Sequence, residues 1–147
     1  MSWDTHKLID LLQEVEKEIE FLTFTRTPVS LEQISQLESR FELHINTDLK
    51  EILTRVGCTS FGFNDMSWEW IQTSNECCRV QYQDEKRAAI LKDSFIFSDD
   101  GGGNQVAVKE DGTLFLLYHD EPDFLQLEGT IHSMLNDFYE YLTRDKA

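Results

Sequence analysis

Two clusters of carboxylates in the second half of the chain carry side chains from which a functional site could be built. In the first, Asp99 and Asp100 precede three consecutive glycines, and residues 98–104 read Ser-Asp-Asp-Gly-Gly-Gly-Asn. Two carboxylates on one loop could bind a divalent cation, but a calcium loop needs further oxygen ligands that glycine side chains lack. The Lys and Ser/Thr of a phosphate-binding loop are also missing. The pattern favours a tight turn that uses glycine at positive φ, with contact to a partner or metal binding as the alternatives.

The second cluster contains His119, Asp120, Glu121 and Asp123, on both sides of Pro122. A histidine beside carboxylates can act as a general base or contribute to a zinc site. The sequence shows no nucleophile at a motif spacing from His119 and no closed set of zinc ligands. The pattern favours a polar strand end, with contact to a partner as the alternative. We predict no catalytic residue, no metal and no cofactor. The candidate partner-binding residues from the two clusters are Asp99, Asp100, Asp120, Glu121 and Asp123.

A third group of candidate contact residues lies between positions 65 and 70. Trp68 and Trp70 are two positions apart, so they face different directions on a helix and the same direction on a strand. A tryptophan is more often a core residue, yet tryptophan is enriched at the energetic centres of protein interfaces. Asp65 and Glu69 add negative charge to this segment. All four residues are therefore candidate partner-binding residues, with core packing as the alternative for the two indoles.

The chain has a net charge of -15, from 28 acidic and 13 basic residues, and the excess is uneven. Between Asp93 and Glu140 there are eleven acidic residues and a single base, Lys109. A negative field of this kind repels nucleic acid and anionic membranes and attracts basic partners. We therefore exclude nucleic acid and membrane as partners and expect the acidic residues to gather on one outer surface. Solubility alone is the alternative explanation of the charge.

The length of 147 residues and the apolar fraction of 40% indicate one folded domain over residues 1–147. No apolar run approaches the roughly 20 residues that span a bilayer, and the first residues do not resemble a signal peptide. Three cysteines, with Cys77 and Cys78 adjacent, fit core or surface thiols better than a disulfide framework or a metal pair. These features predict a cytoplasmic protein.

Helical periodicity is clear in the first third of the chain. Residues 1–29 are predicted to contain an N-terminal helix, because apolar residues recur at helical spacing from position 4 to 24 and Pro28 follows. Ser30 begins a second helix, with Gln33 placed three residues later as a capping box requires.

A third helix can begin at Thr47 and end at Gly57, so residues 30–57 are predicted to form a helical pair. Residues 129–147 are predicted to form a C-terminal helix that Thr130 can cap.

The middle of the chain, residues 58–92, has no clear periodicity. A helix can begin near Asp65 or Ser67, with Trp68, Ile71 and Val80 facing inward.

Residues 93–128 contain three apolar runs of strand length separated by the glycine-rich segment and an Asp-Gly pair, and a fourth run follows them. This pattern predicts a β-meander. Helices followed by strands and then a helix indicate an α+β domain. We predict an antiparallel sheet, or a mixed one, of about four to six strands packed with the N-terminal and C-terminal helices.

Three segments of the chain together resemble the SUKH superfamily, the domain of fungal cell-wall-synthesis regulators and many bacterial immunity proteins. The first is the helical pair, with Leu37-Glu38, Phe41-Glu42-Leu43, Leu49, Ile52-Leu53 and Val56-Gly57. The second runs from Phe97 to Asp120, and the third is the closing helix with Ile131, Met134, Leu135 and Phe138. These segments cover residues 30–60 and 95–142, whereas residues 58–92 match nothing in the family pattern.

The resemblance implies an α+β protein-binding domain of the bacterial immunity type. Such proteins bind a toxin, often a nuclease, that neighbouring cells deliver. We therefore predict a cytoplasmic immunity protein that neutralises a cognate polymorphic toxin with a basic cleft, and no enzymatic activity. The alternative is an intracellular scaffold or regulatory module that binds proteins without a toxin partner.

Overall fold

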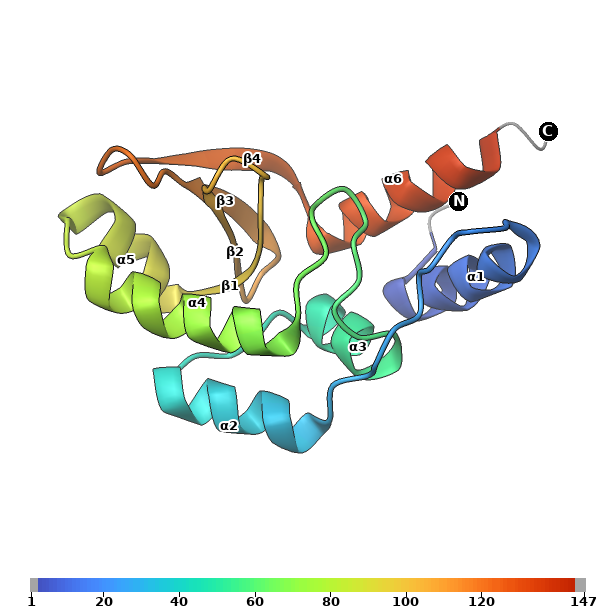
Figure 1. Cartoon of the computed structure of the whole chain (residues 1–147), viewed down its shortest axis with the longest axis horizontal. Helices are drawn as coiled ribbons and strands as arrows, with labels where there is room; N and C mark the ends of the chain where they lie inside the picture. Colours follow the sequence, from blue (N-terminus) through green and yellow to red (C-terminus); the bar gives the residue numbers. More distant parts are fainter. Residues whose placement is uncertain (1–2, 145–147) are drawn as a thin grey trace.

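The computed structural model describes residues 3–144, which form an α+β fold of helices and one antiparallel sheet, as predicted (Figure 1). The predicted C-terminal helix extends to residue 147, and its last three positions lie outside the described residues. In chain order the elements are α1 (Thr5–Glu18), α2 (Leu31–Phe41), α3 (Thr47–Arg55), α4 (Trp68–Gln81), α5 (Glu85–Asp93), β1 (Ser94–Asp99), β2 (Gln105–Lys109), β3 (Thr113–Leu117), β4 (Phe124–Thr130) and α6 (Ile131–Thr143).

The sheet is the predicted meander, with four strands in the order β1-β2-β3-β4 and every neighbouring pair antiparallel. The β2–β3 turn contains the predicted Asp-Gly pair, and Gly112 has a φ of 96°, which a residue with a side chain rarely adopts. Because successive hairpins reverse direction, the β1–β2 and β3–β4 loops lie at one end of the sheet. The β2–β3 turn lies at the opposite end.

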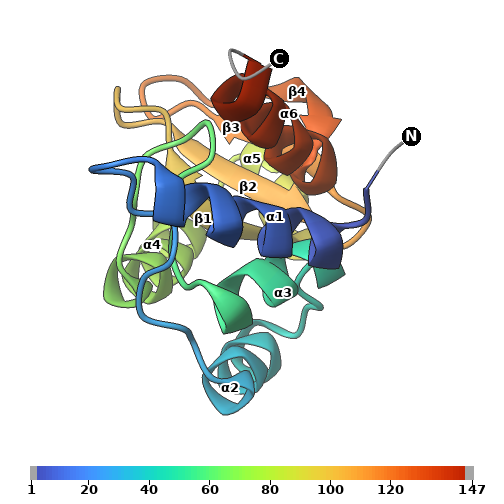
Figure 2. The same ribbon diagram turned by 90° about the vertical axis from the view of Figure 1, so that its right-hand side faces the viewer.

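Alternate residues of the strands belong to two apolar clusters. Phe95 and Phe97 of β1 face the larger cluster, which includes buried residues of α1, α3 and α6. Ile96 faces the smaller cluster, where Cys78 of α4 and Leu91 of α5 pack against the sheet. In Figures 1 and 2 the helices accordingly lie on both sides of the sheet.

The predicted helix starts are largely confirmed by the capping bonds. Ser30 and Gln33 form the expected capping box at α2, and Thr130 caps α6. The cap of α3 is Asn46 instead of Thr47, because the buried Asn46 side chain accepts from Leu49 N and donates to Glu110 O.

The first helix is shorter than its apolar pattern suggested and ends at Glu18. The returning chain is held by the Glu16 carboxylate, which accepts the N–H groups of Phe24 and Thr25 at 2.5 and 2.7 Å. A side chain in the last turn of α1 therefore accepts backbone hydrogen bonds from the chain that returns after the helix.

The ambiguous middle segment forms two helices, of which only α4 was predicted. The start of α4 after Ser67 and the inward position of Ile71 are confirmed, but the inward position of Val80 is wrong, since Val80 is 70% exposed. Polar Asn75 is buried on the inner side of α4, which breaks the apolar periodicity. Helix α5 was missed because only Leu91 is buried in it.

Candidate functional site

The two clusters of carboxylates predicted from the sequence lie next to each other, on loops at one end of the sheet. We call this surface the loop end and define it as residues 99–104 and 118–123. The two loops are joined by Asn104, whose Oδ1 accepts from the His119 backbone N–H at 3.0 Å and lies 2.7 Å from His119 Nδ1. The meander brings together residues that are about 20 positions apart, because its first and third connections lie at the same end.

Asp99 and Asp100 have structural roles in the β1–β2 loop. Asp99 Oδ1 accepts from Gly101 N and from Asn64 Nδ2, which ties the loop to the segment before α4. Asp100 accepts from Gly102 N, Asn104 N and Asn104 Nδ2 at 2.8 to 3.1 Å. The hydrogen bonds from Asn104 and Gly102 lower the pKa of the Asp100 carboxyl below its ordinary value. This arrangement supports the tight-turn interpretation, since both carboxylates are used by the loop itself.

His119 is exposed, and its hydrogen bonds hold the ring against the β1–β2 loop. Because a carboxamide oxygen accepts, the contact with Asn104 Oδ1 places a hydrogen on His119 Nδ1. Gly103 lies under the ring, where an added Cβ would be 3.4 Å from Nδ1. Among residues 3–144 no three His, Cys, Asp or Glu side chains are arranged to hold a metal ion.

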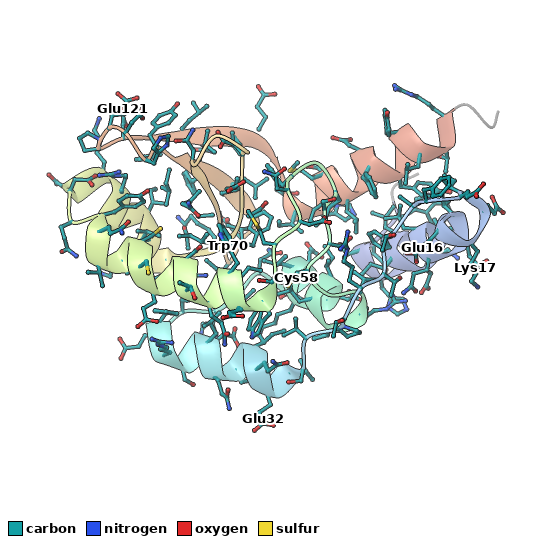
Figure 3. The ribbon with its side chains drawn as sticks, in the orientation of Figure 1. Glu16, Lys17, Glu32, Cys58, Trp70 and Glu121 are labelled. Carbon is teal, nitrogen blue, oxygen red and sulfur yellow. The ribbon has the colours of Figure 1, made fainter. Side chains whose placement is uncertain are left out.

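The three acidic residues of the β3–β4 loop differ in their bonding. Asp123 Oδ1 accepts from Phe124 N at 2.8 Å and lies 3.4 Å from Lys86 Nζ, and the backbone bond lowers the pKa of this carboxyl. Asp120 and Glu121 are exposed, and within residues 3–144 neither has an ion-pair partner. The Glu121 side chain points outward from the molecule in Figure 3. These two residues are therefore the carboxylates of the loop end that remain available to a partner.

The four candidates from the segment before and within α4 are not part of the loop end. Trp68 and Trp70 are both partly buried and pack against the core clusters, so core packing accounts for much of each indole. Trp70 is labelled in Figure 3. Asp65 forms an ion pair with Arg26, and Glu69 is exposed in the first turn of α4. The connection from this segment to the loop end is made by Asn64 through its bond to Asp99.

The expectation that the acidic residues gather on one outer surface is wrong. Glu110 and Asp111 lie at the β2–β3 turn, at the end of the sheet opposite to Asp120 and Glu121. The reason is the meander itself, which places consecutive turns at alternate ends. Residues 110–143 contain eight acidic residues and no Lys or Arg, but these acidic residues occur at both ends of the sheet.

Two asparagines that organise the site were not singled out in the sequence. Asn104 joins the two loops, and Asn64 accepts from Ser98 Oγ through its backbone oxygen while its side chain bonds to Asp99. Asn104 follows three glycines, and asparagine in such a position is a signal for side-chain bonding to a turn. Asn64 had no comparable signal, because its partners are about 35 positions away.

Comparison with protein families shows that the sequence pattern of the SMI1 / KNR4 family (SUKH-1) matches residues 28–144. The chain belongs to this family. The SUKH-1 match includes residues 58–92, where the resemblance found from the sequence had no counterpart. No curated protein matches the chain. The loop end and all the candidate residues lie inside the SUKH-1 match, whereas α1 precedes it and still contributes Leu8, Ile9 and Leu12 to the larger core.

Among residues 3–144 of this SUKH-1 chain, no helix combines the length and apolar character needed to cross a membrane.

Proposed function

We propose that the chain is a bacterial immunity protein that binds and neutralises a cognate polymorphic toxin in the cytoplasm and catalyses no reaction. Membership of the SUKH-1 family supports a protein-binding role. The observation that carries the proposal is the pair of exposed carboxylates Asp120 and Glu121, neither of which has an ion-pair partner within residues 3–144.

The charge of this surface favours a toxin with a basic cleft, such as a nuclease that must hold phosphates. Complementary charges can raise association rates to about 10⁸–10⁹ M⁻¹s⁻¹ at low salt. At physiological salt the Debye length is about 8 Å, so Asp120 and Glu121 act at close approach. Asp99, Asp100 and Asp123 contribute negative potential while their hydrogen bonds keep the two loops in a fixed shape.

The direct test is co-expression of the chain with the polymorphic toxin encoded beside its gene. The double variant Asp120→Lys, Glu121→Lys is expected to lower cell survival, because it replaces two attractive charges with two repulsive ones. With purified proteins, the association rate should fall by about tenfold or more at low salt and by less at high salt.

The matched control is the double variant Asp93→Lys, Glu110→Lys, which changes the net charge equally at the opposite end of the sheet. It should leave survival and the association rate within about twofold of those of the unmodified chain. Equal loss in both double variants would mean that net charge alone matters and would contradict a role for the loop end. If the chain leaves toxicity unchanged, it is no immunity protein for that toxin, and the scaffold alternative gains support.

A further inference from the structure

The two edge strands of the sheet differ in how their outer hydrogen-bonding groups are satisfied. At the β1 edge, Asn75 of α4 donates to Ile96 O at 2.8 Å and accepts from Ile96 N at 2.9 Å. One side chain thus makes the pair of bonds that a neighbouring strand would make. Arg79, one turn further along α4, donates to Ser94 O at 2.6 Å. The β1 edge is therefore closed by the protein itself.

The β4 edge is closed only at its two ends. Phe124 N donates to its neighbour Asp123, and Thr130 N donates to Ser133 Oγ at 2.7 Å. Tyr118 N donates to Asp123 O, and the antiparallel alternation that follows directs the backbone groups of Phe124 and Gln126 away from β3. The register is irregular beyond Leu127, so the alternation is regular only up to that residue. Within residues 3–144 no side chain caps Phe124 O or the backbone groups of Gln126, and β4 forms the outer margin of the sheet in Figure 1.

The side chains along β4 give the open edge a definite chemical character. Leu125 is 48% exposed and alternates with Gln126, which is also exposed. Glu128 follows on the same strand, and the exposed Asp120 and Glu121 of the loop end precede it. An added strand would therefore meet an apolar side chain on one face of the sheet and a polar, negative surface on the other.

Charge argues against a second copy of the chain at this edge. Each copy has a net charge of -15, and β3, β4 and α6 contain no Lys or Arg. Lys86 of α5 pairs with Asp123 of the loop end, whereas within residues 3–144 Asp120, Glu121 and Glu128 have no ion-pair partner. Antiparallel pairing of two β4 strands would bring these acidic residues together, and like charges on facing strands are destabilising. A basic segment of a different protein would instead be attracted to these acidic residues, which stabilises its pairing with β4.

We propose that the β4 edge binds an extended segment of the partner protein, in which basic and apolar residues alternate, as an additional antiparallel or parallel strand. Main-chain bonds to Gln126 and to Phe124 O would supply affinity, and alternate side chains would supply selectivity. The inference rests on the protein-binding function proposed above and adds the mode of binding. It also continues the loop end, because β4 begins directly after the β3–β4 loop.

The experiment uses the full chain and a synthetic peptide of about eight residues in which lysine and valine alternate. Saturable binding is expected, with hydrogen exchange at the backbone amide of Gln126 slowed about tenfold. A peptide of alternating glutamate and valine should not bind. Gln126→Pro removes an outward N–H that the sheet does not use, so it should abolish binding of the lysine peptide while the fold is retained.

Glu128→Lys is a second variant that keeps every backbone group, and it should weaken lysine-peptide binding. The proposal is overturned if the lysine peptide fails to bind or binds without protecting Gln126. It is also overturned if Gln126 is protected by self-association, seen as protection that rises with protein concentration without peptide. If the peptide does not bind at β4, the chain can still neutralise a toxin through another surface. If the peptide binds at β4 but the chain does not protect cells from the toxin, only the immunity function is rejected.

Discussion

Phe21 shows at the scale of one residue how an unfavourable backbone conformation is retained on the surface. It lies in the turn after α1 with a φ of 71°, and its side chain is 92% exposed. The left-handed conformation costs a residue with a Cβ roughly 1–2 kcal/mol, and no burial of the ring offsets this cost. The turn is instead maintained by Glu16, which binds the chain beyond it.

Replacing Phe21 by glycine is expected to raise the free energy of unfolding by about 0.5–1 kcal/mol, since glycine avoids most of the left-handed penalty. Urea denaturation would measure the change. Phe21→Ala is the control, because it removes the ring but keeps the Cβ, and it should not stabilise the protein. A stabilisation by alanine equal to that by glycine would show that the exposed ring, not the backbone, causes the strain.

Asp100 predicts how stability responds to acid. Its folded-state pKa is lowered from 3.8 by hydrogen bonds from Asn104 and Gly102. The carboxylate therefore contributes stability above the unfolded pKa, and this contribution is lost as the pH falls through the lower folded-state pKa. When thermal unfolding is measured from about pH 5 to pH 2, the melting temperature of Asp100→Asn should fall by less than that of the unmodified chain. If the melting temperatures of the two proteins fall equally with pH, the stability of the loop does not depend on the charge of Asp100.

The three cysteines are expected to differ in reactivity. Burial raises the pKa of Cys58 and of Cys78 to about 11, whereas Cys77 is exposed. Because the thiolate is the reactive form, iodoacetamide at neutral pH should modify Cys77 first. Intact mass should show one fast addition that Cys77→Ser abolishes, and three additions in denaturant. Cys58 is partly buried against the larger apolar cluster and Cys78 is buried in the smaller one, so fast modification of either in the native protein would contradict this packing.

At the scale of elements, α4 has the central structural role because it connects the core to the β1 edge. Arg79 donates to Leu91 O and Ser94 O and lies 4.5 Å from the Phe41 ring, so it links α5, β1 and α2. Burial lowers the pKa of Arg79 to about 10, which leaves the guanidinium charged at neutral pH. Asn75 is fully buried beside it and bonds to both backbone groups of Ile96.

Removal of the Asn75 amide should therefore be costly. Asn75→Ala leaves the N–H and C=O of Ile96 buried without partners, and we expect a loss of about 3 kcal/mol in the free energy of unfolding. Asn136→Ala is the control, because Asn136 on α6 is only partly buried and bonds to exposed Glu140, and it should change stability by less than about 0.5 kcal/mol. A loss for Asn75→Ala as small as that of the control would show that water or a rearranged side chain can close the β1 edge.

At the scale of the whole molecule, the net charge of -15 favours expansion through mutual repulsion. Surface ion pairs such as Arg55–Asp10 offset the mutual repulsion of the acidic residues only locally. Raising sodium chloride from about 20 to 200 mM should screen the repulsion and increase the melting temperature by about 2–4 °C. Potassium chloride should have the same effect. A decrease in melting temperature would mean that screened ion pairs contribute more than screened repulsion.

Much of the fold was predictable because its signals are local. The capping boxes, the glycine turns and the alternation of the strands each involve residues within a few positions of one another. The middle segment was not predictable in the same way. On α4 the buried face includes a polar asparagine whose partners lie on β1, so its burial cannot be deduced from helical spacing alone.

The sequence by itself determined the meander, most of the helix starts, the resemblance to the SUKH superfamily and the negative sign of the net charge. Only the tertiary structure decided which carboxylates are available, since Asp99 and Asp100 bond to their own loop while Asp120 and Glu121 face solvent. It also decided that one sheet edge is closed and the other open. The physical reason is the sequence distance over which the interactions act. Turn and helix preferences involve residues within a few positions of one another, whereas the capping of a strand edge depends on side chains from segments that are distant in the sequence.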